Sequence, residues 1–500
     1  MSPAAFPISG PGFAWSAAEV ADRVAGRAAA LAADLHPGRP WPVPAGQTAA
    51  DVIEALAVWA AGGVLAPLHP DLPPAQRDRA LGALEACPAL PEGSAAVVWT
   101  SGTSGRPTGV VLGWAGLEHV ARSAGTRLGV GSEDVWAHTL SPATMGGLAT
   151  LVRARTLGHG LRVEGPFRAE GLSAALDSGA VTFASLVPIM LDRLLQARRG
   201  RPFPHIVRGL LLGGAATPRS LVEAALALDA PLFLTYGMTE ASSQVATAGP
   251  DLVRAVPGTV GAPLDGVEVR IGAGGVIQVR SPGLALARIV ADPVAPVPDP
   301  GPRMPDTGAP VPDTGPPVPD PGPPVPDPGP RMPDTGAPVP DPRPPVVPEG
   351  QPGGGQATAA PRLEPLASTD GWYRTGDLGH LDGEGRLFVT GRAAERIISG
   401  GATVDPLSVE GVLLHHPDVA DVCVVGAADP EWGERVVALL VPAPGSAQEA
   451  LADRLTTFAR LGLRPPERPR DWVFVDVLPR NRGGKLDRRE ALRIVRERLG

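Results

Sequence analysis

The segment Pro231-Leu-Phe-Leu-Thr-Tyr-Gly-Met-Thr-Glu240 carries a clear signal of the fold. It begins as a short apolar run, which is typical of a buried strand, and it ends in a Tyr-Gly turn followed by Thr239 and Glu240. A ring, a hydroxyl and a carboxylate at a strand end could stack on a flat base, bond a phosphate and bind Mg²⁺. Taken alone, a Tyr-Gly turn is more often structural than functional.

Residues 1–290 alternate strand-like and helical segments on both sides of that stretch. Short apolar runs bounded by Gly, Pro or Ser predict strands at AAVVWT (95–100), VTFASLVP (181–188), IVRGLLLGG (206–214) and PLFLTYG (231–237). Helical segments lie between them, as in PIMLDRLLQARR (188–199) and TPRSLVEAALAL (217–228). This alternation predicts an α/β fold with a large N-terminal domain of helix-covered, largely parallel sheets.

The composition changes at about residue 291, where Pro-Asp recurs seven times at a period of seven between 298 and 341. Residues so rich in proline cannot form a helix or a coiled coil, so 291–360 is expected to be a solvated, partly polyproline-II insertion. A passive expanded loop is favoured over a PxxP ligand for a partner. Residues 361–392 are predicted to complete the first domain, and 393–500 to form a small α+β C-terminal domain.

Composition excludes several classes of protein. The 500 residues carry a net charge of −8, which argues against a nucleic-acid partner because such a partner needs a basic face. Two cysteines cannot build a disulfide scaffold. The N-terminus shows no signal peptide, and no apolar run is long enough to span a membrane, so a cytoplasmic location is expected. The oligomeric state stays open.

Five further segments carry candidate chemistry, and each could also be an ordinary turn. They are Thr100-Ser-Gly-Thr-Ser-Gly-Arg-Pro-Thr-Gly109, Leu211-Leu-Gly-Gly-Ala-Ala216, Trp372-Tyr-Arg-Thr-Gly-Asp377 with Gly391-Arg392, and Ile397-Ile-Ser-Gly-Gly401 together with Leu478-Pro-Arg-Asn-Arg-Gly-Gly-Lys485. The first can ring a phosphate with backbone N–H groups, although it is not a Walker motif. The single lysine, Lys485, and both tyrosines, Tyr236 and Tyr373, lie inside these segments or the opening one.

Together and in this order, the segments resemble the adenylate-forming superfamily of acyl-CoA synthetases, peptide-synthetase adenylation domains and luciferases. The resemblance implies an enzyme that uses ATP and Mg²⁺ to activate a carboxylic acid as an acyl-adenylate and then transfers it to coenzyme A. It also implies that the C-terminal domain is mobile and turns about a hinge at Glu395.

The resemblance assigns a role to each matching position. The phosphate loop would be Thr100, Ser101, Gly102, Thr103, Ser104 and Gly105. The adenosine site would be Gly214, Ala215, Ala216, Tyr236, Gly237, Asp377 and Arg392. Thr239, Glu240 (the Mg²⁺ ligand) and Lys485 would be catalytic, with Lys485 bridging the acid and the α-phosphate. Ser399, Gly400 and Gly401 would line the coenzyme A tunnel.

Two positions depart from the superfamily pattern. The phosphate loop usually ends Pro-Lys-Gly, but here position 108 is threonine, so a phosphate-facing cation is missing and Arg106 is one candidate to replace it. Thr144 stands where histidine is common. These changes keep open the alternative of a catalytically degenerate scaffold that binds nucleotide without turnover.

The segments Thr235–Thr247 and Thr182–Leu194 are similar to the 2-succinylbenzoate–CoA ligases of menaquinone synthesis. This resemblance implies 2-succinylbenzoate as the acid and an acyl pocket at Thr144, Leu186, Val187, Pro188 and Ser242. A ligase for another aryl or fatty acid is the alternative within the same superfamily.

Overall fold

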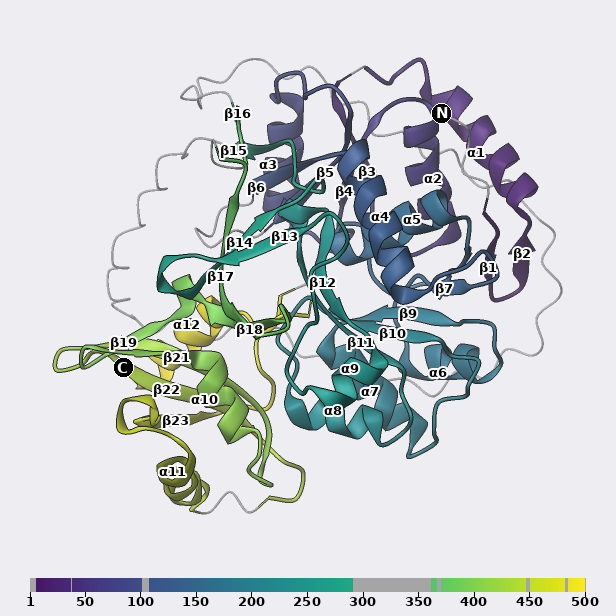
Figure 1. Ribbon diagram of the computed structural model, residues 1–500. Coiled ribbons are helices and arrows are strands. Elements are labelled where there is room, and N and C mark those ends of the chain that lie inside the picture. Colours follow the sequence, from purple (N-terminus) through teal and green to yellow (C-terminus); the bar gives the residue numbers. More distant parts are fainter. Residues whose placement is uncertain are drawn as a thin grey trace, which may run out of the picture. The chain divides into compact units, whose positions relative to one another are not determined.

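The computed structural model describes residues 6–36, 38–100, 108–290, 361–366, 370–446, 450–481 and 484–499. The Pro-Asp repeat, the loop 101–107 and the terminal residues therefore lie outside the described part of the chain. Within the described residues the strands form four sheets, here called A to D (Figure 1).

Sheet A has eight strands and is parallel except at its two edges. In sheet order they are β12 (Ser243–Ala248), β11 (Leu232–Met238), β10 (Gly209–Leu212), β9 (Phe183–Leu186), β7 (Val135–Ala137), β8 (Gly160–Arg162), β1 (Ile8–Gly10) and β2 (Phe13–Trp15). Only β11–β12 and β1–β2 pair antiparallel. The carboxyl ends of the parallel strands therefore meet at one edge, where an α/β sheet places its binding groups.

Both faces of sheet A are covered, and alternate residues divide between two cores. Leu211 and Phe233 face the core that holds α4 (Trp114–Leu128) and α5 (Met145–Leu157). Leu210 and Leu232 face the other core, together with α6 (Ala169–Asp177), α7 (Pro188–Arg198), α8 (Arg219–Leu226) and α9 (Pro250–Ala255). A strand buried on both faces reads as a continuous apolar run, which is why these strands were visible in the sequence.

Sheet B has six strands and mixed directions. They are β16 (Arg362–Glu364), β15 (Ala287–Val290), β6 (Thr108–Gly113), β5 (Ser94–Thr100), β4 (Val64–Leu68) and β3 (Pro40–Pro44), accompanied by α1 (Ala17–Leu31), α2 (Ala49–Ala60) and α3 (Pro74–Glu85). Ser16 and Thr48 open α1 and α2 through capping boxes with Glu19 and Asp51.

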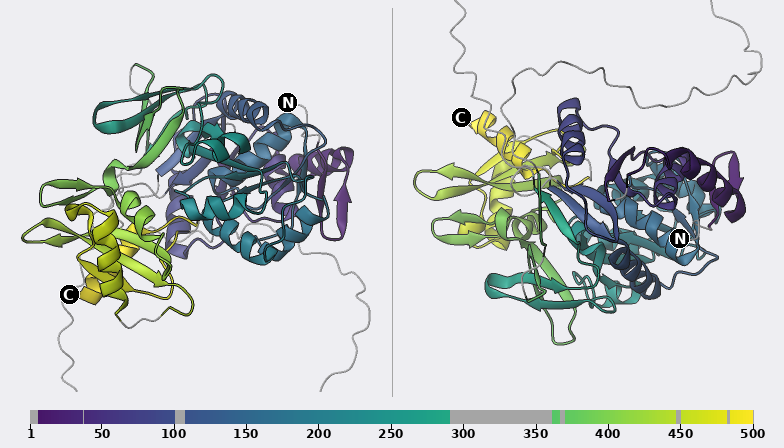
Figure 2. Two further views of the ribbon diagram at one scale, coloured as in Figure 1. Left: turned by 60° about the horizontal axis from the view of Figure 1, so that its bottom comes forward. Right: turned by 90° about the horizontal axis from the view of Figure 1, so that it is seen from above.

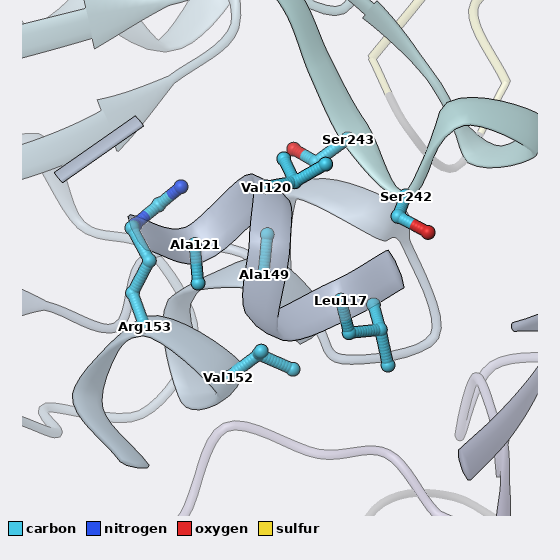
Figure 3. Close-up of a pocket in the computed structure, with 8 residues that line it drawn as sticks. All are labelled: Leu117, Val120, Ala121, Ala149, Val152, Arg153, Ser242 and Ser243. Carbon is cyan, nitrogen blue, oxygen red and sulfur yellow. The ribbon is translucent and has the colours of Figure 1, made fainter. Parts of the chain in front are cut away.

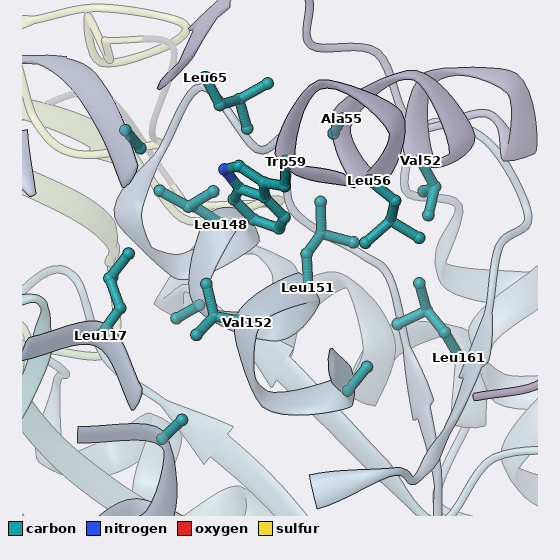
Figure 4. Close-up of a cluster of buried hydrophobic side chains, with 14 of the residues drawn as sticks. Val52, Ala55, Leu56, Trp59, Leu65, Leu117, Leu148, Leu151, Val152 and Leu161 are labelled. Atoms are coloured by element: carbon teal, nitrogen blue, oxygen red, sulfur yellow. The ribbon is translucent and has the colours of Figure 1, made fainter. Parts of the chain in front are cut away.

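Trp59 anchors α2 in the core between the helices and sheet B. Figure 4 shows its ring among Leu65, Leu148 and Leu151. Its indole Nε1 donates to the carbonyl oxygen of Ala95 at 3.0 Å, so the polar atom of this buried side chain is satisfied. Burying such a side chain contributes about 1.5–3 kcal/mol.

Sheet C is entirely antiparallel. Its strands are β13 (Glu268–Ile271), β14 (Val276–Arg280), β17 (Tyr373–Leu381) and β18 (Leu387–Arg392), with the short helix η2 (Ala273–Gly275) joining the first two. Strands β17 and β18 pair Asp377 directly with Arg392, so two predicted site residues share one rung of this sheet.

Sheet D contains β20 (Ala402–Val404), β19 (Ile397–Ser399), β22 (Gly433–Pro442), β21 (Val419–Asp429) and β23 (Asp471–Phe474). Val424 and Ala438 face α10 (Pro406–Leu413) and α11 (Leu451–Gly462), whereas Cys423 and Leu439 face α12 (Arg488–Leu499). Figure 2 shows α12, in yellow, beside these strands. Helix η4 (Pro465–Glu467) leads into β23.

The segments singled out in the sequence form the expected elements, and the parallel sheet is present as sheet A. Sheets B and C depart from it, because hairpins such as β5–β6 turn the chain back on itself. None of the helices that the structure describes combines the length and apolar character needed to cross a bilayer.

Candidate active site

A buried carboxylate joins sheets A and C at the adenosine end of the predicted site. The hydroxyl of Tyr236, on β11, donates to Asp377 Oδ2 at 2.8 Å, and Arg392 Nε lies 2.8 Å from Asp377 Oδ1. Thr375 Oγ1 accepts the backbone N–H of Asp377 at 3.0 Å. Burial and the charge of Asp377 raise the pKa of Tyr236, so the phenol stays protonated and rigidly held.

A second carboxylate, Glu240, lies directly after β11 in the helix η1 (Thr239–Ala241). Its backbone oxygen accepts the N–H of Ala285 at 2.9 Å, which ties η1 to the segment leading into β15. Its side chain is 3.6 Å from Nη2 of Arg288, and the same nitrogen donates to the hydroxyl of Tyr373 at 2.5 Å. Burial, and then Glu240, raise the pKa of Tyr373 to about 12.

Lys485 lies in the turn before α12, where the charges of both carboxylates act on its ammonium group. Its backbone N–H donates to Asn481 Oδ1 at 3.1 Å, and a Cβ added to Gly214 would sit 3.9 Å from Lys485 Cε. The side chain keeps exposed surface, yet the surrounding protein, and then the charge of Arg392, lower the pKa of its ammonium group. Asp377 and Glu240 act in the opposite direction. Among the described residues no carboxylate comes within 4.0 Å of this ammonium group, so its charge is available to a ligand.

Gly214 and Val187 complete this corner. Gly214 has φ +82°, a backbone conformation that favours glycine, and a Cβ there would also lie 3.4 Å from Val187 Cγ1. A Cβ on Gly484 would lie 3.1 Å from Val187 Cγ2. The glycines therefore let the Lys485 turn approach the junction of β9 and α7.

The predicted acyl-pocket residues divide into two groups. Leu186, Val187 and Pro188 are buried at the β9–α7 junction. Thr144 is the N-cap of α5, where its hydroxyl accepts the N–H of Gly147 at 3.3 Å and donates to the Ser141 carbonyl at 2.8 Å. Both hydrogen-bonding directions of Thr144 are thereby occupied by the backbone.

Ser242 lies in a different place, on the wall of a small cavity (Figure 3). The cavity measures about 10 Å³ and is lined by Leu117, Val120, Ala121, Ala149, Val152, Arg153, Ser242 and Ser243. Ser242 is 2% exposed, and its Oγ has no hydrogen-bond partner among the described residues. A cavity of this size has room for about one water molecule.

Arg153, on α5, is a buried cation beside this cavity that the sequence reasoning missed. Nη1 donates to Gln244 Oε1 at 3.1 Å, Nη2 lies 3.5 Å from Ser185 Oγ, and the guanidinium lies 4.3 Å above the ring of Trp136. No carboxylate of the described residues pairs with it. Burial lowers the pKa of Arg153 to about 10, so the group stays charged at neutral pH.

Trp136, whose ring packs against the guanidinium of Arg153, is itself fixed by its neighbours. Its Nε1 donates to Ser185 Oγ at 3.1 Å, and its ring stacks on Phe183 with centroids 4.9 Å apart. His159 packs on another side of Trp136, and burial lowers the pKa of His159 to about 4. His159 is therefore neutral at neutral pH, and it adds no second positive charge beside Arg153.

The predicted coenzyme A residues form the turn between β19 and β20. Gly400 and Gly401 have φ +58° and +78°, and the Gly400 N–H donates to the Trp432 carbonyl at 2.8 Å. Ser399 is buried, and its Oγ has no partner within the described part of the chain. A Cβ on Gly400 would lie 2.6 Å from the Trp432 ring, so only glycine fits at this contact.

The predicted hinge residue Glu395 ends the helix η3 (Ala393–Glu395) and accepts Arg488 Nε at 2.9 Å. The predicted phosphate loop is described only at its stem, where Thr100 Oγ1 lies 3.4 Å from the Thr108 carbonyl oxygen. Ser101, Gly102, Thr103, Ser104, Gly105 and Arg106 lie outside the described residues.

Comparison with known proteins identifies a family for two parts of the chain. The family model described as AMP-binding enzyme matches residues 82–286, and the model of the AMP-binding enzyme C-terminal domain matches residues 408–485. The chain belongs to the AMP-binding enzyme family.

The relatives of this AMP-binding enzyme include ligases that join an acid to coenzyme A. A 2-succinylbenzoate–CoA ligase of Bacillus cereus is 30% identical over 407 residues, which cover 80% of this chain and 70% of the relative. The o-succinylbenzoate CoA synthetase of Bacillus subtilis, in complex with the acyl-adenylate intermediate OSB-AMP, is 24% identical and superposes with a TM-score of 0.75 over 98% of this chain and 96% of that one. A structure of the Bacillus subtilis protein with ATP and magnesium ion is 25% identical, with a TM-score of 0.73 over 97% and 96% of the two chains.

The predicted superfamily and fold class are confirmed by these matches, and the names of the relatives agree with the predicted acid. The roles of single residues stay predictions. Neither Arg153 nor Arg288 was among the predicted residues. The only signal for Arg153 was its place in the mainly apolar helical run LATLVRA. Nothing in the sequence marked Arg288, because its position depends on how the strands pair.

The residues present fit Mg²⁺ that arrives with the nucleotide. The described residues contain no cluster of three or more His, Cys, Asp or Glu side chains that could hold a metal by themselves. Glu240 offers one carboxylate, and Mg²⁺ is commonly held by one or two carboxylates together with substrate phosphates. The donor set is therefore adequate only when a polyphosphate supplies the remaining oxygens.

Proposed function

We propose that this AMP-binding enzyme is a ligase that uses ATP and Mg²⁺ to activate 2-succinylbenzoate as an acyl-adenylate and then transfers it to coenzyme A, in menaquinone synthesis. The observation that carries the substrate assignment is Arg153, a buried cation without a carboxylate partner among the described residues. 2-Succinylbenzoate has two carboxylates. The succinyl carboxylate reacts, and the ring carboxylate remains charged and needs a partner inside the pocket.

Arg153 suits that second carboxylate. An uncompensated charge in a buried position is costly, and it persists where an anion arrives to pair with it. The unbonded hydroxyl of Ser242 lines the same small cavity and could add a hydrogen bond. Because the cavity is small, the acid must enlarge it by moving side chains such as Leu117 and Val152. A fatty acid has no group for Arg153, which disfavours that alternative.

The first half-reaction needs two anions to meet. Lys485 carries a positive charge beside Gly214, and the carboxylates of Asp377 and Glu240 both act on it. In this position it can lie between the incoming succinyl carboxylate and the α-phosphate, and reduce their repulsion as the bond forms. Thr239 would hydrogen-bond the α-phosphate. When bound, Mg²⁺ neutralises phosphate charge next to Glu240.

The nucleotide would be held by groups that are already fixed. Asp377 would accept the ribose hydroxyls, and Arg392 would keep its carboxylate oriented. Tyr236 and Gly237 on one side, with Gly214, Ala215 and Ala216 on the other, would flank the adenine. In the second half-reaction the thiol arm of coenzyme A would pass Ser399, Gly400 and Gly401. The cytoplasm, where ATP and coenzyme A are supplied, is the proposed location.

The test is a panel of acids, each with ATP, Mg²⁺ and coenzyme A, followed by release of pyrophosphate and by formation of the thioester. The panel contains 2-succinylbenzoate, benzoylpropionate (which lacks the ring carboxylate), benzoate and a fatty acid. We expect 2-succinylbenzoate to exceed benzoylpropionate in kcat/KM by about 10²-fold, because a charge-assisted hydrogen bond contributes about 1.5–3 kcal/mol. Equal activity with both acids, or activity with the fatty acid alone, would overturn the assignment. No activity with any acid would favour the degenerate scaffold.

A further inference from the structure

Position 108 lacks the lysine that the phosphate loop would need, and the chain has no other lysine than Lys485. A polyphosphate binding beside Glu240 still requires cationic neutralisation, because its charges repel the carboxylate. A described residue near Thr108 could supply that positive charge. This inference rests on the proposed function of the same site.

The pairing of β15 with β6 places Arg288 near Thr108. Strand β6 begins at Thr108, at the stem of the phosphate loop, and β15 pairs antiparallel with it so that Arg288 lies directly opposite Val110. Thr108 and Val110 are two residues apart on one strand, so their side chains point to the same face. Arg288 points to that face as well, which places it diagonally across from Thr108 at about 7–8 Å.

The contacts of Arg288 direct its guanidinium toward Glu240. Nη2 donates to the Tyr373 hydroxyl at 2.5 Å and lies 3.6 Å from Glu240 Oε1, which is too long for a hydrogen bond. The guanidinium lies 5.3 Å from the centre of the Tyr373 ring. Tyr373 and Glu240 thus set the direction of the side chain while leaving most of its donors uncommitted.

Arg288 also has a donor that no described residue accepts. Nε of Arg288 is buried and has no hydrogen-bond partner among the described residues, although the side chain as a whole is 32% exposed. A buried N–H without a partner is costly, and a ligand oxygen would satisfy it. A guanidinium presents its donors as a planar fork that matches the oxygens of a phosphate.

We propose that Arg288 binds the β- and γ-phosphates of ATP, and the pyrophosphate that leaves, and that it performs from β15 the task of the lysine absent at position 108. The same arginine is placed to hold the carboxylate of Glu240 in position until the nucleotide arrives. Arg288 is therefore a substrate-binding residue of this chain, supplied by the strand that directly precedes the repeat.

The experiment uses the full-length protein and the variants Arg288→Ala, Arg288→Lys and Arg288→Ala with Thr108→Lys. Arg27→Ala is the matched control, since Arg27 pairs with Glu54 between α1 and α2 and is not itself one of the site residues. Three quantities are measured: binding of inorganic pyrophosphate with Mg²⁺ by calorimetry, the rate of ATP–pyrophosphate exchange, and transfer to coenzyme A from acyl-adenylate supplied preformed.

We expect Arg288→Ala to slow exchange by about 10²-fold, as the loss of one preorganised charge contact does. Pyrophosphate binding should weaken by about tenfold or more, because a charge-assisted hydrogen bond contributes 1.5–3 kcal/mol. Transfer from preformed acyl-adenylate, which involves no pyrophosphate, should stay close to the parent rate. Thr108→Lys should restore much of the exchange lost in Arg288→Ala, and Arg288→Lys should fall between.

Unchanged pyrophosphate binding in Arg288→Ala would overturn the proposal. So would an equal loss in both half-reactions without recovery by Thr108→Lys, because that pattern indicates a structural role beside Glu240. Failure of the proposed function is a separate result. In that case the parent protein would exchange pyrophosphate with no acid of the panel, while the calorimetric comparison of parent and Arg288→Ala would still decide the role of Arg288.

Discussion

Arg488 and Arg153 are two arginines whose side chains are largely buried. Arg488 begins α12 in the C-terminal part of the molecule, and Arg153 lies on α5 against sheet A. Arg488 donates to the Glu395 carboxylate at 2.9 Å, to both oxygens of Glu410 and to the Val424 carbonyl at 3.0 Å. Arg153 has an amide, a serine hydroxyl at 3.5 Å and an aromatic face. One cation has two carboxylate partners within the described residues, and the other has none.

The difference separates structural charge from functional charge. Around Arg488 the buried Glu410 also accepts the Val424 N–H at 2.7 Å, so the cation, the anion and the strand β21 satisfy one another. Removing one member would leave a charge buried without a partner. Around Arg153 the protein supplies dipoles only, so the full opposite charge must come from outside. The following changes test that distinction.

Arg488→Met should have the largest effect, on folding. It leaves Glu410 buried without its cation, and breaking a buried pair in this way costs about 3–5 kcal/mol. Equilibrium unfolding in urea measures the loss. The double variant Arg488→Met with Glu410→Leu should recover much of it, because both charges are then gone. If Arg488→Met were as stable as the parent, the pairing of a buried arginine with carboxylates would not mark it as a residue that stabilises the fold.

Lys485→Ala should follow, with an effect on chemistry instead of stability. Its ammonium pairs with no described carboxylate, so urea unfolding should be unchanged, whereas adenylate formation should fall by about 10²–10³-fold. Transfer from preformed acyl-adenylate should be spared, and equal loss of both half-reactions would contradict the assigned role. The pKa of Lys485 is lowered, so its ammonium group should lose its proton at a lower pH than an ordinary lysine does. As the pH rises, adenylation should therefore fall before the pH reaches the usual range for lysine.

Arg153→Met comes third. It removes a buried charge that has no partner, so unfolding stability should be equal to the parent or higher. The preference for 2-succinylbenzoate over benzoylpropionate, about 10²-fold in the parent by the energy of one charge-assisted hydrogen bond, should disappear. The ratio of kcat/KM for the two acids measures it. A fall in stability with the preference retained would make Arg153 a structural residue like Arg488.

The sequence predicted much of the fold because the decisive strands are buried on both faces. GLLL of β10 and FASL of β9 are apolar or small throughout, so they stand out from their polar surroundings. The antiparallel pairing of β6 with β15 was not predicted, because Arg288 and its β6 partner Val110 lie 178 positions apart in the chain and no local pattern encodes that pairing. Register of this kind becomes visible only when the sheet is assembled.

The site was predicted as a set of motifs but not as a set of contacts. Tyr236 and Asp377 were expected to touch different parts of the nucleotide, and the structure shows that they also bond to each other across 141 residues. Arg153 and Arg155 look alike in the run LVRAR, yet only Arg153 is buried, because it faces sheet A while Arg155 pairs with Glu118. Which side of a helix carries a functional charge depends on what packs against it.

Arg493→Met should have the smallest effect, and it provides the matched control for Arg488 on the same helix. Arg493 also contacts two carboxylates, Glu490 at 2.5 Å and Glu497, but its side chain is 56% exposed. Water solvates the two remaining carboxylates after the change, so no group is left buried without a partner. We expect the urea midpoint to stay at the parent value within error. A loss as large as that of Arg488→Met would show that the number of ion pairs, and not their burial, decides which arginines hold this fold together.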